Sequence, residues 1–261
     1  MSTEADREVT ELFTEELREA LSLPAYPRSA QYEPQWVLEN LMGPNVLWLT
    51  EALAEVMDLA PGMRVLDMGC GKAVSSIFLA KEFGVETWAA DLWITATDNW
   101  ERIREAGVER QVFPVHAEAH QLPFADRFFD AAVSLDAYHY FGTDDLYLAY
   151  FARFVKPGGR IGIVVPGFVQ EFDSVPEHLA PYWEPAYWSF HSPIWWRRHW
   201  ERSDAVDVEV ADLVPDGADL WLRWLEVCAA HGYPYDEREL AMVREDGGRA
   251  LGFTRLVARV R

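Results

Sequence analysis

A short glycine-rich loop and two acidic residues are the part of this sequence whose spacing most directly suggests chemistry. Asp67 precedes Gly69, Cys70 and Gly71 at the end of an apolar run. Glycines between a strand and a helix let a ligand approach the backbone closely, although a plain tight turn is the alternative. Asp91 follows about 20 residues later, at the end of the next apolar run, where an acid can hold ribose hydroxyls. The pattern predicts a site for a nucleoside-containing cofactor.

The residues around the loop favour S-adenosylmethionine over a dinucleotide. Val74 occupies the position of the third glycine in a dinucleotide-binding loop. A carboxylate at Asp67 would repel a pyrophosphate, which binds to bare N–H groups at a helix N-terminus, and it would attract a cation. S-adenosylmethionine has an ammonium, a sulfonium and a ribose but no phosphate. We expect Asp67 to hold the ammonium, directly or through water, and Asp91 to hold the ribose.

The loop also resembles that of a known family. The motif Val65-Leu66-Asp67-Met68-Gly69-Cys70-Gly71 is similar to motif I of the class I S-adenosylmethionine-dependent methyltransferases. Asp91 matches the acid that ends their second strand, and residues 117–124 resemble their adenine-binding segment Gly-Asp-Ala-x-x-Leu-Pro-Phe. Phe129-Asp130 and Lys156-Pro157-Gly158-Gly159 match the segments before strands four and five. The similarity covers roughly residues 45–167 and is closest to the subgroup with the ubiquinone/menaquinone-type methyltransferases and the cyclopropane fatty acid synthases.

This resemblance implies S-adenosylmethionine as the cofactor and S-adenosylhomocysteine as its product. Glu118 stands where the family usually has Asp, and its carboxylate could accept from the adenine amine while the Ala119 N–H donates to the ring. Trp93 could pack on the adenine face, and Cys70 would contribute its backbone N–H. The expected cofactor-binding residues are Asp67, Gly69, Cys70, Gly71, Asp91, Leu92, Trp93, Glu118, Ala119, Ser134 and Leu135.

Three candidate catalytic residues, Asp136, His139 and Tyr140, follow the predicted strand 129–135. Ligands of open α/β sheets bind beyond the carboxyl ends of the strands, so this segment should face the transferred methyl group. The ordinary pKa of histidine, near 6.5, suits a general base, and Asp136 could orient the acceptor. The alternative is that Asp136 caps the next helix and His139 packs structurally.

An aromatic-rich segment, residues 168–203, follows the predicted fifth strand and has two interpretations. It could be a hydrophobic cap on the sheet. It could instead be a lid over the acceptor, because aromatic faces stabilise cations by about 0.5–2 kcal/mol. In the second interpretation the acceptor-binding residues are Tyr32, Trp36, Trp183, Tyr187 and Trp188.

The pair His116 and His120 is the spacing that most suggests a metal. It lies at the end of a predicted strand rather than on a helix, and a third ligand is not near it in the sequence. Zinc sites usually have three or four protein ligands at recognisable spacing. We therefore expect no metal.

The strands and helices that must position these residues are predicted by apolar runs that alternate with helical patterns. Strands that alternate with helices of 10–15 residues predict βαβ units and a parallel sheet. The resemblance implies a Rossmann-like α/β fold with a seven-stranded, mostly parallel sheet, helices on both faces and an antiparallel last strand. We expect strands over 63–68, 85–90, 112–116, 129–135, 160–165, 206–214 and 254–260, and helices over 4–22, 73–83, 95–106, 144–155, 220–231 and 237–244.

The expected organisation is a single domain, 1–261. It would comprise a helical N-terminal cap (1–60), a cofactor-binding core (61–167), the aromatic lid (168–203) and a C-terminal completion of the sheet (204–261). The predicted function is methyl transfer from S-adenosylmethionine to the N, O or C atom of a small organic acceptor. Two alternatives stay open: a lipid-modifying enzyme similar to cyclopropane fatty acid synthases, and a non-catalytic protein that binds S-adenosylmethionine.

Composition excludes several partners. The chain of 261 residues has 23 Lys and Arg against 43 Asp and Glu, a formal net charge of -20. This charge disfavours nucleic acid and an anionic membrane surface, both of which attract clustered cations. Two cysteines are too few for a disulfide scaffold. Neither an apolar run of about 18 residues nor a signal peptide is visible. We expect a cytoplasmic monomer or homodimer without a membrane span.

Overall fold

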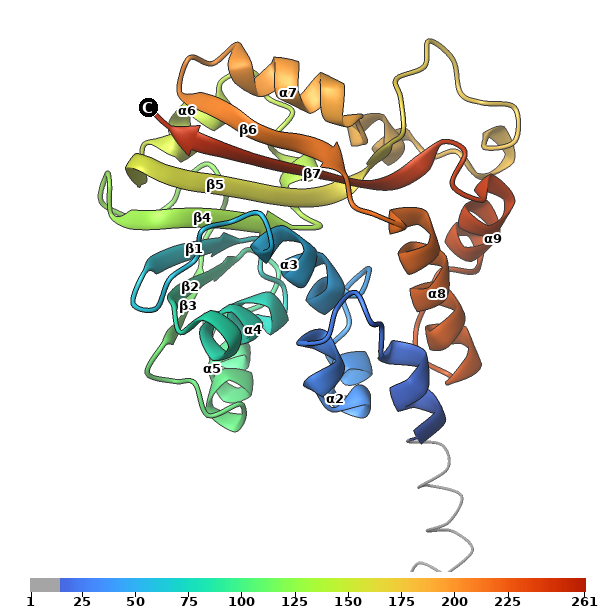
Figure 1. Ribbon diagram of the computed structural model, residues 1–261, viewed down its shortest axis with the longest axis horizontal. Coiled ribbons are helices and arrows are strands. Elements are labelled where there is room, and N and C mark those ends of the chain that lie inside the picture. The colour runs from blue at the N-terminus through green and yellow to red at the C-terminus, as the bar shows by residue number, and fades with distance from the viewer. Residues whose placement is uncertain (1–14) are drawn as a thin grey trace, which may run out of the picture.

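A computed structural model describes residues 15–261, which form a sheet of seven strands in the order β3-β2-β1-β4-β5-β7-β6 (Figure 1). The first five strands pair in parallel, whereas β7 is antiparallel to both β5 and β6. The predicted Rossmann-like α/β fold with an antiparallel last strand is confirmed. The strands are β1 (Arg64–Met68), β2 (Glu86–Asp91), β3 (Val112–His116), β4 (Phe129–Leu135), β5 (Val155–Phe168), β6 (Val206–Leu213) and β7 (Leu251–Val260).

Helices cover both faces of the sheet. One face carries α3 (Val46–Ala54), α4 (Val74–Phe83), α5 (Ala96–Glu105) and α8 (Gly217–Ala230), and the other carries α6 (Tyr147–Ala152) and α7 (Pro193–Glu201). Alternate residues of a strand point to opposite faces, so Val65 packs under α3 and α4, and Leu66 packs under α6 and α7. Both are fully buried, as in a central parallel strand.

Side-chain caps fix the start of some helices but not of the helix beside the glycine loop. Asn45 caps α3, and Asp236 caps α9 (Glu237–Asp246), each by accepting from two backbone N–H groups of the first turn. At the start of α4, Ala73 has a left-handed φ of +60° and no capping side chain. The first turn of α4 instead carries two serines that donate to Asp67.

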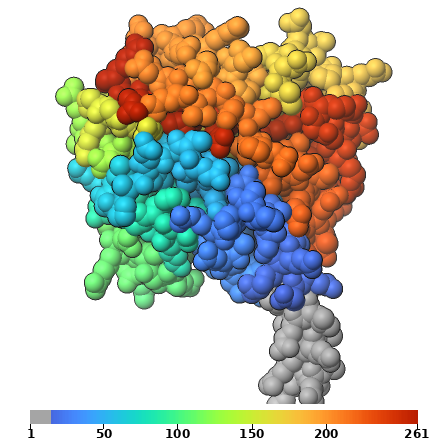
Figure 2. All heavy atoms as spheres, in the orientation of Figure 1, coloured from blue at the N-terminus to red at the C-terminus, as the bar shows by residue number. Residues whose placement is uncertain are grey.

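The N-terminal region is a set of short helices. The predicted helix over 4–22 lies partly outside the described residues, and 15–21 are helical. η1 (Ser29–Gln31) and α2 (Pro34–Glu39) follow, and α3 begins only at Val46. Residues 40–45, here called the strap, join α2 to α3 without helix. Trp48 of α3 lies against Trp224 of α8 with ring centroids 6.2 Å apart, so the N-terminal helices pack on the C-terminal ones (Figure 2).

The aromatic segment divides into two parts. The first contains the 3-10 helices η3 (Ala180–Tyr182) and η4 (Pro185–Ser189) and contacts α9, where Glu184 pairs with Arg238. The second is α7, whose Trp196 and Trp200 are fully buried beside Tyr138. The second part is therefore sheet-covering core, which corrects the expectation that the whole of 168–203 is a lid.

Strand β5 is longer than predicted. It runs from Val155 to Phe168 and includes the Lys156-Pro157-Gly158-Gly159 segment, which the sequence placed before the strand. The register between β4 and β5 shifts between Phe129 and Ala131, and this irregularity accommodates the glycines. Pairing with β7 continues to Phe168, because β7 is also longer than predicted at its N-terminal end.

The predicted helix over 144–155 is shorter in the structure, where α6 spans Tyr147–Ala152. The 3-10 turn η2 (Tyr138–Tyr140) lies between β4 and this helix. Within residues 15–261, no helix is both long and apolar enough to cross a membrane.

Candidate active site

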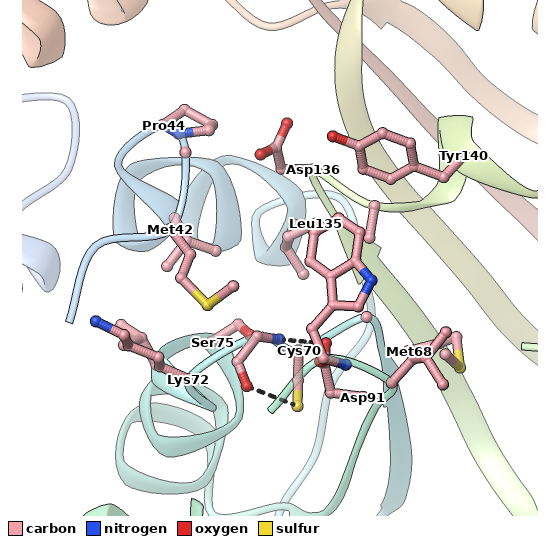
Figure 3. Close-up of a pocket in the computed structure, with 18 of the residues that line it drawn as sticks. Met42, Pro44, Met68, Cys70, Lys72, Ser75, Asp91, Leu135, Asp136 and Tyr140 are labelled. Atoms are coloured by element: carbon pink, nitrogen blue, oxygen red, sulfur yellow. Dashed lines mark hydrogen bonds between the residues drawn. The ribbon is translucent and has the colours of Figure 1, made fainter. Parts of the chain in front are cut away.

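A cavity of about 470 Å³ opens at the carboxyl ends of β1, β2 and β4 (Figure 3). Such an edge of an open α/β sheet is where ligands bind. The cavity brings together many of the residues that the sequence predicts for the site. These are Gly69, Cys70, Gly71, Asp91, Leu92, Trp93, Glu118, Ala119, Leu135, Asp136 and Tyr140.

The glycine loop is held against β2 by its own backbone. The N–H groups of Gly69 and Cys70 both donate to the Ala90 carbonyl, at 2.8 and 3.2 Å. Gly69 has φ +77°, and a Cβ there would lie 2.3 Å from the Ala137 Cβ, so only glycine fits. The Cys70 N–H was predicted to face a ligand, but it already donates to Ala90.

Asp67 lies directly beneath the cavity and is fully buried. Its Oδ2 accepts from the Ser75 and Ser76 hydroxyls, each at 2.6 Å, and Ser75 lines the cavity. Burial raises the pKa of Asp67 to about 6, against the lowering effect of the two serines. Within the described part of the chain, Oδ1 has no hydrogen-bond partner. A buried acceptor without a donor fits a ligand cation or a bridging water.

Asp91 ends β2 and holds three backbone groups of the site. Its Oδ2 accepts from the Gly71 N–H at 2.8 Å, and its Oδ1 accepts from the N–H groups of Trp93 and Ile94 at 2.7 and 2.9 Å. Asp91 therefore fixes the glycine loop and the start of the next segment. A carboxylate has about four acceptor positions, so one place is left for a ribose hydroxyl.

The predicted adenine end of the cavity is more open. Trp93 is 68% exposed, and its ring lies 5.8 Å from that of Tyr140. Glu118 accepts from the backbone N–H and the ring of His120, and this contact lowers the pKa of Glu118. Its carboxylate is thus engaged within the chain rather than directed only at an adenine amine. Within residues 15–261, no group of three His, Cys, Asp or Glu side chains could hold a metal ion.

Asp136, Tyr140 and the strap form a further part of the cavity wall, here called the acceptor end. Gly43 has φ +100°, and a Cβ there would lie 2.5 Å from the Asp136 Oδ2, so the carboxylate packs against the strap backbone. The strap is held from the far side, where the Trp224 indole N–H donates to the Gly43 carbonyl at 2.7 Å. Burial raises the pKa of Asp136 well above its ordinary value, and the Glu239 carboxylate raises it further.

Comparison with known proteins matches residues 65–159 to the family model of a methyltransferase domain. This region runs from β1 through the cavity-lining segments to β5. Over this region the chain is similar to the class I S-adenosylmethionine-dependent methyltransferases.

Two curated relatives show the range of this similarity. The methyltransferase GfsG of Streptomyces halstedii is 32% identical over 116 residues, covering 44% of this chain and 42% of the relative. A demethylmenaquinone methyltransferase of Corynebacterium glutamicum is 37% identical over 134 residues, covering 48% of this chain and 54% of the relative. The chain thus spans about half the length of the curated relatives it matches.

A solved structure extends the similarity to nearly the whole fold. Geranyl diphosphate C-methyltransferase from Streptomyces coelicolor has a TM-score of 0.67 and 18% identity, with 94% of this chain and 86% of that chain covered. At this identity the likeness shows the shared fold alone.

Not every residue predicted for the site lines the cavity. The Ser134 hydroxyl donates to the Met68 carbonyl at 2.7 Å and is fully buried. His139 is 2% exposed and lies between Tyr140 and Phe190, with ring centroids 4.1 and 5.4 Å away. Burial lowers the pKa of His139 to about 4. A weakly basic ring outside the cavity is poorly placed to act as a general base.

The five aromatic residues predicted to bind the acceptor also lie outside this cavity. Tyr32 donates to Glu82 and stacks on Trp36 on the outer side of α4. Trp183 packs on Phe168, while Trp188 is half exposed. Sequence reasoning instead missed the strap, Ser75 and Trp224. A Gly-Pro step such as Gly43-Pro44 is typical of a break between helices, but no local pattern in the sequence connects it to Trp224.

Proposed function

We propose that this protein transfers the methyl group of S-adenosylmethionine to a small organic acceptor. The observation that carries the proposal is one cavity that runs from the glycine loop and Asp91 to Asp136 and Tyr140. The first end suits a cofactor without phosphate, and the second provides a separate acidic and aromatic wall. The names of the curated relatives, GfsG and demethylmenaquinone methyltransferase, support methyl transfer as the reaction type.

The chain's own residues fit the parts of this cofactor. The free acceptor position of Asp91 fits a ribose hydroxyl, and the Ala119 backbone lies where an adenine edge would meet it. The unpartnered Oδ1 of Asp67 fits the ammonium, directly or through water, with Ser75 between the carboxylate and the cavity. When bound, S-adenosylmethionine supplies a methyl group activated by a sulfonium.

The acceptor end positions the nucleophile and removes its proton. The strap and Tyr140 would hold the acceptor beside the methyl group, since orientation is the largest contribution to such a reaction. We assign proton removal to Asp136, because it lines the cavity and its raised pKa makes it a stronger base than an ordinary carboxylate. His139 would then support the ring of Tyr140 from behind.

Two alternative functions, a lipid-modifying enzyme and a non-catalytic protein that binds S-adenosylmethionine, differ from this proposal in observable properties. A lipid-modifying enzyme would need a basic membrane-facing surface, which a net charge of -20 disfavours. A non-catalytic protein would bind the cofactor but transfer nothing. A cytoplasmic location and a monomeric or homodimeric state are part of the proposal.

Calorimetry tests cofactor choice. We expect heat of binding with S-adenosylmethionine and with S-adenosylhomocysteine, and none with NAD, because the Asp67 carboxylate would repel the NAD pyrophosphate and Val74 occupies the position of the third glycine. Tight binding of NAD, together with no binding of either adenosyl ligand, would show that the site belongs to another cofactor.

A further inference from the structure

Resting on this proposed function, we propose that the acceptor is an amine that enters as a cation, with its nitrogen at the Asp136 carboxylate. The inference comes from the charges at the far end of the cavity, beyond the glycine loop. It narrows the acceptor from any small organic nucleophile to the protonated primary and secondary amines.

The first step is the position of Asp136. It follows β4 directly and has a left-handed φ of +54°, with its own N–H donated to the Val164 carbonyl at 2.8 Å. This backbone turn directs the side chain to the cavity, where Figure 3 shows it across from Tyr140. Among the described residues, no side chain or backbone group donates a hydrogen bond to its carboxylate. Asp136 is half-buried and opens into the cavity, so a ligand there can supply the donor that the carboxylate lacks.

A second carboxylate lies behind the strap. Glu239 lines a neighbouring cavity of about 480 Å³, which shares Gly43, Pro44 and Trp224 with the first. Its carboxylate accepts from the Trp221 indole N–H at 2.7 Å, which is a neutral donor. Burial raises the pKa of Glu239, and its charge in turn raises the pKa of both Asp136 and Tyr140. The acceptor end therefore carries two acidic groups, and an incoming cation would lower the pKa of both and favour their charged forms.

Compensating cations are missing at this end. Within the described part of the chain, Lys72 is the one Lys or Arg that lines either cavity. Figure 3 places it at the opposite end from Asp136 and Tyr140, and its ammonium donates to the Glu39 carbonyl at 3.0 Å. Arg238, next to Glu239 in the chain, pairs with Glu184 instead. A carboxylate or phosphate acceptor would meet repulsion here, and an ammonium would meet attraction.

The walls around the two carboxylates also suit a cation with an apolar body. Tyr140 and Trp224 line the first cavity, and Trp221 and Tyr235 line the second. Aromatic faces attract ammonium groups and bury the carbon skeleton attached to them. Negative charge and aromatic surface therefore point to the same class of ligand.

The proposed step balances without another reactant. The ammonium gives one proton to the Asp136 carboxylate, and the free amine gains its lone pair. The nitrogen then forms a bond to the methyl carbon as the carbon–sulfur bond breaks, and the bonding electrons stay on sulfur. The methylated ammonium and a neutral thioether are formed, and Asp136 releases its proton to solvent.

Matched ligands test this proposal. Phenylethyl, indolylethyl and linear eight-carbon skeletons would each carry, at the end of the alkyl chain, an amine, a hydroxyl or a carboxylate. Binding is measured by calorimetry at pH 7.5 on the full chain saturated with S-adenosylhomocysteine. We expect at least one amine to bind, and its matched alcohol and acid to bind at least about tenfold more weakly or not at all.

Three variants assign the effect to residues. Asn tolerates the left-handed backbone of Asp136, so Asp136→Asn should fold and weaken amine binding by at least about tenfold. Glu239→Gln should weaken it by about threefold, because its charge acts from behind the strap. Glu245→Gln removes one charge from the exposed side of the same helix and should leave binding unchanged.

The outcomes separate this inference from the proposed function. If the unmodified protein does not bind S-adenosylhomocysteine, the proposed function itself is contradicted. If that ligand binds but the acids or alcohols bind as well as the amines, or none of the nine compounds binds, the amine proposal is overturned. Equal amine binding by Asp136→Asn and the unmodified protein would also overturn it.

Discussion

Asp91 combines two roles that the sequence did not separate. An acid at the end of the second strand predicted a ribose contact, and the structure adds three backbone N–H groups that this carboxylate accepts. Any change at Asp91 therefore acts on the loop as well as on the ligand. The same side chain links the stability of the fold to the affinity of the site.

Replacing Asp91 with Ala should lower both stability and cofactor affinity. Three backbone donors lose their acceptor, so we expect the Tm to fall by several degrees, since each lost hydrogen bond costs about 1 kcal/mol. Affinity for S-adenosylhomocysteine should fall at least about tenfold. Thermal melts and calorimetry measure the two effects. Asp98→Ala, which removes an exposed acid from the next helix, is the control. Unchanged affinity in Asp91→Ala would place the ribose elsewhere.

Cofactor binding should depend on pH through Asp67. Its pKa of about 6 lies above its ordinary value, so the folded protein binds a proton there that the unfolded chain does not. The stability that this proton provides is complete below about pH 4 and is lost as the pH rises through 6. A cofactor ammonium near Asp67 would favour the charged carboxylate and lower that pKa again. Affinity should therefore rise between pH 5 and 7, below the ordinary pKa of an α-amino group.

The measurement for Asp67 is proton release. Calorimetry at pH 6 in two buffers with different ionisation enthalpies should show protons released when S-adenosylmethionine binds. Asp67→Asn should abolish the difference between buffers. Equal proton release by this variant and the unmodified protein would mean that another group titrates.

At the scale of elements, the strap decides how the acceptor end is closed. It is held by contacts to two separate elements, through Gly43 to Asp136 after β4 and to Trp224 on α8. Its glycine is required because a left-handed φ coincides with a close approach to a carboxylate. The strap, rather than the aromatic segment, is the part of the chain that covers this cavity.

Gly43→Ala should displace the strap from Asp136. The added methyl group would lie 2.5 Å from the Asp136 Oδ2, so one of the two must move. We expect acceptor turnover to fall at least about tenfold, because small misplacements of an acceptor are costly. Affinity for S-adenosylhomocysteine should change little. Gly62→Ala has a similar left-handed φ of +81° and no atom within 4 Å of the new methyl group, so it controls for backbone strain. Equal acceptor turnover by Gly43→Ala and Gly62→Ala would show that the strap does not position the acceptor.

The elements differ in how far the sequence could predict them. The strand, glycine loop and helix around Asp67 are consecutive, so local spacing predicts their geometry. The contact between Gly43 and Trp224 joins residues 181 positions apart, and no local pattern records it. His139 shows a second limit, because the sequence placed it after β4 but could not show that its ring turns away from the cavity. The full length of β5 was not predicted for a similar reason, because its extension depends on pairing with the distant strand β7.

At the scale of the whole molecule, the two ends of the chain cooperate to form the site. Helices from the N-terminal region pack on α8, and Arg223 of α8 donates to the Ala20 carbonyl at 2.7 Å. The matched family region, 65–159, provides the glycine loop and Asp91 as well as Asp136 and Tyr140, whereas residues outside it provide the strap and Trp224. Part of the acceptor end thus lies outside the matched region, and we expect this part to contribute to the choice of acceptor.

The net charge of the whole molecule favours the same class of ligand as the acidic groups at the acceptor end. With a net charge of -20, the molecule attracts cations and repels anions at long range. This field favours arrival of an ammonium at a site that already contains Asp136 and Glu239. Screening by salt would weaken the attraction at distances beyond about 10 Å but not the contact at Asp136 itself.

Methyl transfer from labelled cofactor is the most direct test of the central claim. The protein is incubated with S-adenosylmethionine that carries an isotopically labelled methyl group and with pooled amine acceptors, and the products are analysed by mass spectrometry. We predict equal amounts of S-adenosylhomocysteine and of one acceptor bearing a single labelled methyl group, both strongly reduced in Asp91→Ala at a cofactor concentration that does not saturate the variant. Tight binding of the cofactor with no labelled product from amine, hydroxyl or carboxylate pools would contradict the account and leave a protein that binds S-adenosylmethionine without using it.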